Sequence, residues 1–113
     1  MGLFGKNKNK QVKQESTELQ GMTSFDNMAY IIVTENSDDQ VLEICDTILN
    51  GRAVLANFNK VSTSDANSML SFVSGVIYAI EGRYFQIESK LFLFARQEEM
   101  ADGSLEQYVE DTK

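Results

Sequence analysis

Residues 64–80 carry an apolar pattern that predicts a helix with two separate apolar faces. Apolar side chains recur every three or four residues along one broad face, as in a helix that packs on a core. That face consists of Ala66, Met69, Leu70, Val73, Val76, Ile77 and Ile80. A second stripe on another side consists of Ser68, Phe72, Gly75 and Ala79. Small side chains at this spacing let two helices approach closely. We therefore expect a partner or a second copy of the chain on the second stripe; the alternative is that the domain itself covers both faces.

Four runs rich in apolar and β-branched residues predict strands, at residues 28–34, 53–58, 83–88 and 91–95. A first helix is predicted between the first two strands. Ser37 is its expected N-cap with Gln40 as the capping-box partner, and Gly51 follows its end. The helix at 64–80 is capped by the polar run that begins at Ser62, and we expect it to end at Gly82. A tight turn near Ser89 makes the last two strands a hairpin.

The order strand, helix, strand, helix, strand, strand determines the expected fold class. Two strands joined by a helix imply a right-handed parallel crossover, and the hairpin adds antiparallel strands. We expect an α/β fold: a small mixed βαβαββ sheet with two helices packed on it, as a two-layer sandwich. Residues 1–27 are predicted to be a flexible basic arm, 28–96 the folded domain and 97–113 an acidic tail. Leu105, Tyr108 and Val109 suffice for one or two amphipathic turns in that tail.

The charge distribution separates the arm from the rest of the chain. The net charge is −7, but residues 1–13 carry +4, which leaves −11 on residues 14–113. An acidic body argues against nucleic acid as a ligand, because phosphate contacts need a basic surface. The arm could instead contact an anionic membrane weakly, since each lysine near such a surface contributes about 1 kcal/mol. The residues expected to do so are Leu3, Phe4, Lys6, Lys8, Lys10 and Lys13. The alternative is a disordered, solubilising tail.

Enzyme chemistry finds little support in the composition. The 113 residues contain no histidine, which excludes the common catalytic triads and most zinc sites, and no glycine-rich phosphate loop is present. Cys45 is the only cysteine, so no internal disulfide can form and a reducing compartment fits best. Its place on the apolar side of the first predicted helix favours a small hydrophobe over a nucleophile. We expect no catalysis, cofactor or metal. No apolar run reaches the ~18–20 residues of a membrane span.

Three stretches together resemble a known family. Residues 50–58 read Asn-Gly-Arg-Ala-Val-Leu-Ala-Asn-Phe, and residues 72–79 read Phe-Val-Ser-Gly-Val-Ile-Tyr-Ala. With Gly82, Ile87 and the Leu-Phe-Leu-Phe run at 91–94, they resemble the SepF family of bacterial cell-division proteins. The resemblance extends over roughly residues 30–95 and follows the same order of elements.

This resemblance implies a non-enzymatic, cytoplasmic adaptor at the inner face of the cell membrane at the division site. SepF-like proteins bind the C-terminal tail of the tubulin-like division protein FtsZ and tether its filaments to the membrane. They act as dimers that can polymerise, and an N-terminal amphipathic helix is their membrane anchor. Gly75 corresponds to the family's self-association glycine, which agrees with the stripe that also contains Ser68, Phe72 and Ala79. Phe92 corresponds to an aromatic position near the FtsZ-tail groove.

Gln86, Phe72 and Tyr78 are further candidates for contact with the FtsZ tail. Family members often have a basic residue where this chain has Gln86. Two other functions stay open at this point. One is a regulatory domain that binds a small ligand, which would need a concave pocket with convergent polar groups. The other is a self-assembling structural protein that does not bind FtsZ.

Overall fold

Four strands form one mixed sheet in a computed structural model, which describes residues 21–113. The strands are β1 (Ala29–Ile32), β2 (Val54–Asn57), β3 (Arg83–Glu88) and β4 (Leu91–Ala95), in the spatial order β1-β2-β4-β3. β1 and β2 run parallel and are connected through α3 (Asp38–Leu49). β4 runs antiparallel to β2 and β3, and α4 (Thr63–Ala79) connects β2 to β3. The expected α/β class and element order are confirmed.

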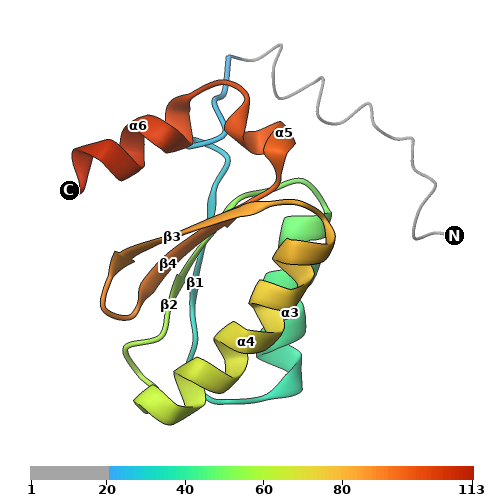
Figure 1. The fold of residues 1–113 in the computed structure, drawn as a ribbon, viewed down its shortest axis with the longest axis vertical. Coiled ribbons are helices and arrows are strands. Elements are labelled where there is room, and N and C mark those ends of the chain that lie inside the picture. The colour runs from blue at the N-terminus through green and yellow to red at the C-terminus, as the bar shows by residue number, and fades with distance from the viewer. Residues whose placement is uncertain (1–20) are drawn as a thin grey trace, which may run out of the picture.

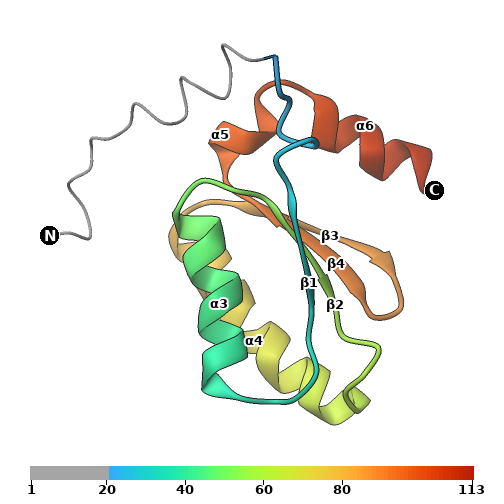
Figure 2. The ribbon, with the colours of Figure 1, turned by 180° about the vertical axis from the view of Figure 1, so that it is seen from behind.

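Helices α3 and α4 cover one face of the sheet and enclose the larger core (Figures 1 and 2). Its fully buried side chains include Val33, Ile44, Ile48, Val54, Phe58, Val73 and Phe94. The broad apolar face predicted for α4 is the face it buries, since Ala66, Met69, Val73 and Ile77 are all in this core. Leu70, Val76 and Ile80 pack at its margin.

The opposite face of the sheet has its own cover, formed by the C-terminal segment. α5 (Gln97–Met100) and α6 (Ser104–Asp111) lie across it in both ribbon views (Figures 1 and 2). Leu105 is fully buried there in a second core with Leu55, Leu93 and Met100. The structure therefore adds two helices to the two that the sequence predicts. β4 requires this second cover because it is apolar on both faces, and burying those side chains is favourable.

The beginning of α3 differs in detail from the predicted capping box. The Ser37 hydroxyl accepts the N–H of Gln40, as expected. The Gln40 side chain, however, accepts the N–H of Thr34 at 2.8 Å and donates to the Thr34 hydroxyl at 2.8 Å. The predicted capping box is therefore wrong for Gln40, whose side chain bonds to Thr34 and not to the N–H of Ser37. Gln40 instead fixes the segment after β1, which ends two residues earlier than predicted.

The end of α4 shows why Gly82 is a glycine. The helix ends at Ala79, Ile80 is its C-cap, and Glu81 adopts the left-handed conformation with φ of 58°. A Cβ atom on Gly82 would lie 2.7 Å from the backbone oxygen of Ala95. Gly82 is therefore required by the close approach of β4, and the predicted end of the helix at Gly82 is too late by three residues.

Candidate functional site

The second stripe of α4 is uncovered in the described part of the chain. Ser68, Phe72, Gly75 and Ala79 are all exposed, and Phe72 retains 52% of its accessible surface. A Cβ atom placed on Gly75 would meet no atom within 4 Å. The alternative that residues 21–113 cover both faces of this helix is therefore wrong. We call the four residues the α4 stripe.

A groove between α3 and α4 adjoins the α4 stripe. Its cavity measures about 360 Å³, and its wall includes Val41 and Leu42 of α3 together with Ser68 and Phe72 of α4. Leu42 is an exposed large apolar residue that the sequence reading did not select. The spacing to Leu49 could have identified it. Leu49 lies seven residues further along α3, so the two leucines fall on one line of the helix beside its buried face.

Phe92 and Gln86 lie side by side on the sheet face that α3 and α4 cover. They are register partners in β4 and β3, and Phe92 is half-buried while Gln86 is exposed. The Phe92 ring meets Phe58 edge-on at 6.1 Å and stacks with Phe94 at 6.4 Å. These contacts hold the ring in a fixed orientation beside the exposed part of the strand.

Tyr84 lies on the same face as Phe92 and Gln86, and it was not predicted as a site residue from the sequence. It pairs with Phe94 in the register, stands two residues before Gln86 on the same face, and is 53% exposed. The alternation along β3 was the signal that could have identified it, because residues two apart in a strand share a face. We call Tyr84, Gln86 and Phe92 the β3–β4 edge patch.

The four predicted contacts for the FtsZ tail do not form one site. Phe92 and Gln86 are together, but Phe72 lines the α3–α4 groove, whose wall contains neither of them. Tyr78 is 86% exposed and six residues from Phe72, which places the two about 120° apart around the helix. Phe72 therefore lies among the predicted self-association residues and apart from Phe92 and Gln86, and Tyr78 points away from the groove.

Cys45 lies on the buried face of α3. Burial, and then the negative charge of Asp46, raise the pKa of the Cys45 thiol, which keeps it protonated and unreactive. Within residues 21–113, no three His, Cys, Asp or Glu side chains gather closely enough to hold a metal ion. No helix in that range combines the length and the apolar character needed to cross a membrane.

A small α/β domain with an uncovered helix stripe that contains an exposed phenylalanine is typical of proteins that assemble with other proteins. The groove beside the stripe is mixed, because Asn36 and Asp38 accompany its apolar side chains. Residues 31–97 match the family described as "Cell division protein SepF". This chain belongs to the SepF family, as the sequence motifs predicted.

Three curated relatives carry the same name. The protein of Ruminiclostridium cellulolyticum is 26% identical over 93 residues, which is 82% of this chain and 60% of the relative. That of Lactobacillus helveticus is 29% identical over 68 residues, or 60% of this chain and 47% of the relative. That of Thermoanaerobacter sp. (strain X514) is 24% identical over 121 aligned positions, which cover 96% of this chain and 88% of the relative. The chain thus spans about half to three fifths of the first two relatives.

Proposed function

We propose that this chain is a non-enzymatic cell-division adaptor that self-associates, binds the C-terminal tail of FtsZ and holds FtsZ filaments at the membrane. Membership of the SepF family supports the division role. The observation that carries the proposal is the uncovered α4 stripe in a chain of this family. In the proposal its partners are the FtsZ tail and further copies of itself, as a homodimer or a longer polymer, and not nucleic acid.

Self-association is proposed at the α4 stripe. Gly75 stands in the middle of the stripe with open space around its Cα, so the backbone of a second helix can approach there. Phe72 and Leu42 add exposed apolar area on the side of the groove. Helix pairs pack at 8–10 Å between axes, and the smaller distances require small side chains at the contact. Both requirements of a helix–helix interface are thus present on one side of α4.

Binding of the FtsZ tail is proposed at the β3–β4 edge patch. β3 is an edge strand of the sheet, so backbone groups on its outer side are free of sheet partners within residues 21–113. An extended peptide can pair with such an edge while its side chains use neighbouring apolar positions. Phe92 supplies an aromatic anchor that Phe58 and Phe94 already orient. Tyr78 and Phe72 remain secondary candidates from α4.

Membrane contact is proposed for the N-terminal arm. Leu3, Phe4, Lys6, Lys8 and Lys10 lie outside the described residues, so their support is composition alone. In this proposal the protein acts in the cytoplasm at the inner face of the membrane. The attachment of each arm is weak, and assembly through the α4 stripe combines many arms.

The small-ligand alternative has less support. A cavity of about 570 Å³ lies beside α5, but its charged groups bond to the protein itself. The Arg96 guanidinium donates two hydrogen bonds to Glu99, at 2.7 and 2.8 Å. Asp102 accepts the N–H groups of Ser24 and Ser104. These polar groups do not converge on an open position, as a ligand site requires.

The proposal is tested by titrating a labelled C-terminal peptide of the host FtsZ with the protein and measuring fluorescence anisotropy. We expect saturable binding, and Phe92→Ala should weaken it about 30-fold, since an aromatic anchor contributes roughly 2 kcal/mol. Phe92 is half-buried, so circular dichroism must first show that this variant folds.

Two tyrosines of nearly equal exposure allow a loss of binding at the patch to be distinguished from a loss caused by unfolding. Tyr84→Ala changes the β3–β4 edge patch, whereas Tyr30→Ala changes the other edge of the sheet; the two side chains are 53% and 55% exposed. Binding should weaken in the first variant and stay unchanged in the second. Absence of saturable binding by the unaltered protein would refute the FtsZ assignment.

A further inference from the structure

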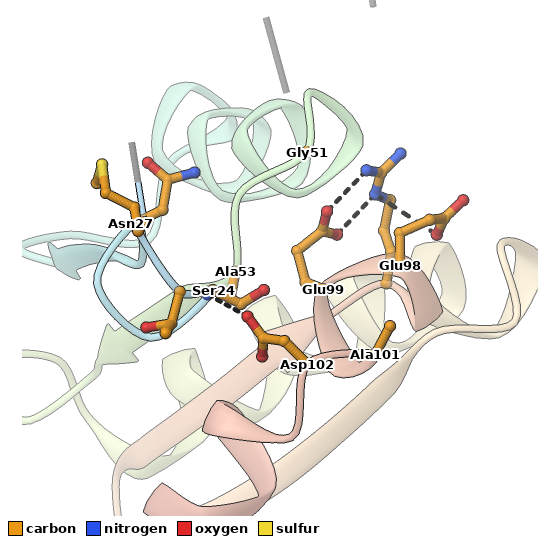
Figure 3. A pocket seen from close by; sticks show the side chains of 12 residues that line it. Ser24, Asn27, Gly51, Ala53, Glu98, Glu99, Ala101 and Asp102 are labelled. Atoms are coloured by element: carbon orange, nitrogen blue, oxygen red, sulfur yellow. Dashed lines mark hydrogen bonds and ion pairs between the residues drawn. The ribbon is translucent and has the colours of Figure 1, made fainter. Parts of the chain in front are cut away.

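Residues 21–27, which we call the strap, hold the connection between α5 and α6 from the other end of the chain. The N–H of Ser24 donates to Asp102 Oδ2 at 2.8 Å, a bond between residues 78 positions apart. The N–H of Phe25 donates to the Ser104 hydroxyl at 3.0 Å. The Phe25 ring also lies 5.3 Å from the ring of Tyr108 in α6. Figure 3 shows Ser24 and Asp102 next to each other in the wall of the cavity beside α5.

The strap is a built turn rather than a loose chain end. Thr23 and Asp26 bond reciprocally: the Thr23 N–H donates to the Asp26 carboxylate at 3.2 Å, and the Asp26 N–H donates to the Thr23 hydroxyl at 3.1 Å. At its other end, Arg52 Nε donates to the backbone oxygen of Asn27 at 2.8 Å. The strap therefore bridges the α5–α6 connection and the segment between α3 and β2.

α6 is a short helix that is held by the second core on one side and by the strap on another. It has eight residues, of which Leu105 alone is fully buried, while Tyr108 and Val109 are half-buried. Helices this short are not stable alone in water. A cavity of about 570 Å³ that is open to solvent lies between the strap and α5. Regions with few buried contacts open at lower free energy than the core.

We propose that the strap, α5 and α6 form one cooperative unit that opens from the sheet without unfolding the α3–α4 side. Detaching the strap then loosens α6 and uncovers the apolar sheet face that contains Leu55 and Leu93. Residues 1–20 precede the strap directly in the sequence. The inference rests on contacts among residues 21–113 and does not depend on FtsZ binding or membrane attachment.

Hydrogen exchange of the full chain, followed by mass spectrometry, tests the coupling. Phe25→Ala removes the ring contact with Tyr108. We expect exchange to accelerate roughly two- to tenfold both in the strap and in residues 97–111, the effect of losing one aromatic pair. Coupling is reciprocal, so Tyr108→Ala should accelerate exchange in the strap as well. α3 and α4 should exchange as in the unaltered protein.

Leu49→Ala is the matched control. Leu49 is 48% exposed and Phe25 40% exposed, but Leu49 lies in α3, on the other side of the sheet. This control should leave residues 97–111 unchanged. Ser104→Ala removes the acceptor of the Phe25 N–H without altering either ring, and should reproduce the pattern of Phe25→Ala.

Two results would overturn the inference. Faster exchange confined to residues 21–27 in both Phe25→Ala and Ser104→Ala would make the strap an independent appendage. Faster exchange of equal size in α3 and α4 would show that the protein opens only as a whole.

Discussion

At the scale of single residues, Gly75 carries the strongest argument for an interface. A glycine inside a helix lowers stability by about 0.5–1 kcal/mol relative to alanine. Nothing in residues 21–113 requires a glycine there, because a Cβ atom would have open space around it. Gly82 is the opposite case, since its Cβ would meet the Ala95 oxygen at 2.7 Å. A destabilising residue without an internal reason is well explained by a helix that packs against it from another chain.

Gly75→Ala should therefore raise the free energy of unfolding by about 0.5–1 kcal/mol, because alanine restricts the unfolded chain and fits the helix. Urea denaturation at low protein concentration measures this, with an unchanged m-value expected. Gly82→Ala is the control and should destabilise, because the β4 backbone cannot move away cheaply. A Gly75→Ala variant that is less stable than the unaltered protein would show that the fold itself needs this glycine.

At the scale of secondary-structure elements, α6 determines how much of the sheet is exposed. Its Leu105 is fully buried among Leu55, Leu93 and Met100. Without this helix, the face of β2 and β4 opposite α3 and α4 would be open to water. The acidic C-terminal segment thus stabilises the fold despite its polar composition.

Leu105→Ala should lower the free energy of unfolding by about 2–4 kcal/mol, the usual cost of truncating a buried leucine. Guanidinium or urea denaturation measures the change. A loss below about 0.5 kcal/mol, as expected for a surface substitution, would mean that α6 is not docked in solution.

Asp102 makes the docking of the strap sensitive to pH. Burial alone would raise the pKa of its carboxyl group, but hydrogen bonds from the backbone N–H groups of Ser104 and Ser24 and from the Ser104 hydroxyl outweigh it and lower the pKa. A lowered pKa in the folded state gives stability that is present above the unfolded value of about 4 and lost as the pH falls through the folded value.

We therefore expect Asp102→Asn to destabilise at pH 7, and we expect this effect to shrink as the pH falls below the unfolded value of about 4. The difference should stay below about 1 kcal/mol, because Asp102 is exposed and screened by solvent. Thermal melts of both proteins across pH measure it. An equal effect of the substitution at every pH would exclude the carboxylate charge as the cause.

The sequence predicted those elements whose signals are local. β3 and β4 begin and end where the apolar and β-branched runs predicted, and Ser37 and Ser62 cap the two long helices. α5 and α6 were missed as a cover, because Leu105 gains its burial from β2 and β4, far back in the chain. Likewise, periodicity revealed the α4 stripe, but only packing could show that Phe72 and Phe92 lie in different sites.

At the scale of the whole molecule, the surfaces lie on different sides. The α4 stripe and the groove belong to the α3–α4 side, whereas the strap enters beside α5 and α6 on the other side (Figures 1 and 2). Assembly through α4 consequently leaves the start of the described chain accessible.

Anionic vesicles should bind the full chain weakly and release it as salt increases, because the lysine attraction is screened beyond about 8 Å at physiological ionic strength. Deleting residues 1–13 should abolish co-sedimentation with vesicles and leave peptide binding intact. Continued sedimentation of the shortened protein would remove the arm from the membrane proposal.

The most direct test of the account is the oligomeric state of Gly75→Lys in sedimentation velocity. A lysine there would place an unpaired charge in the proposed helix contact, and its desolvation costs several kcal/mol. Asn67→Lys adds the same charge at an exposed position of α4 outside the stripe. We predict a dimer or larger assembly for the unaltered protein and Asn67→Lys, and a folded monomer for Gly75→Lys. Assemblies of unchanged size in Gly75→Lys, or a monomeric unaltered protein at high concentration, would contradict the α4 interface.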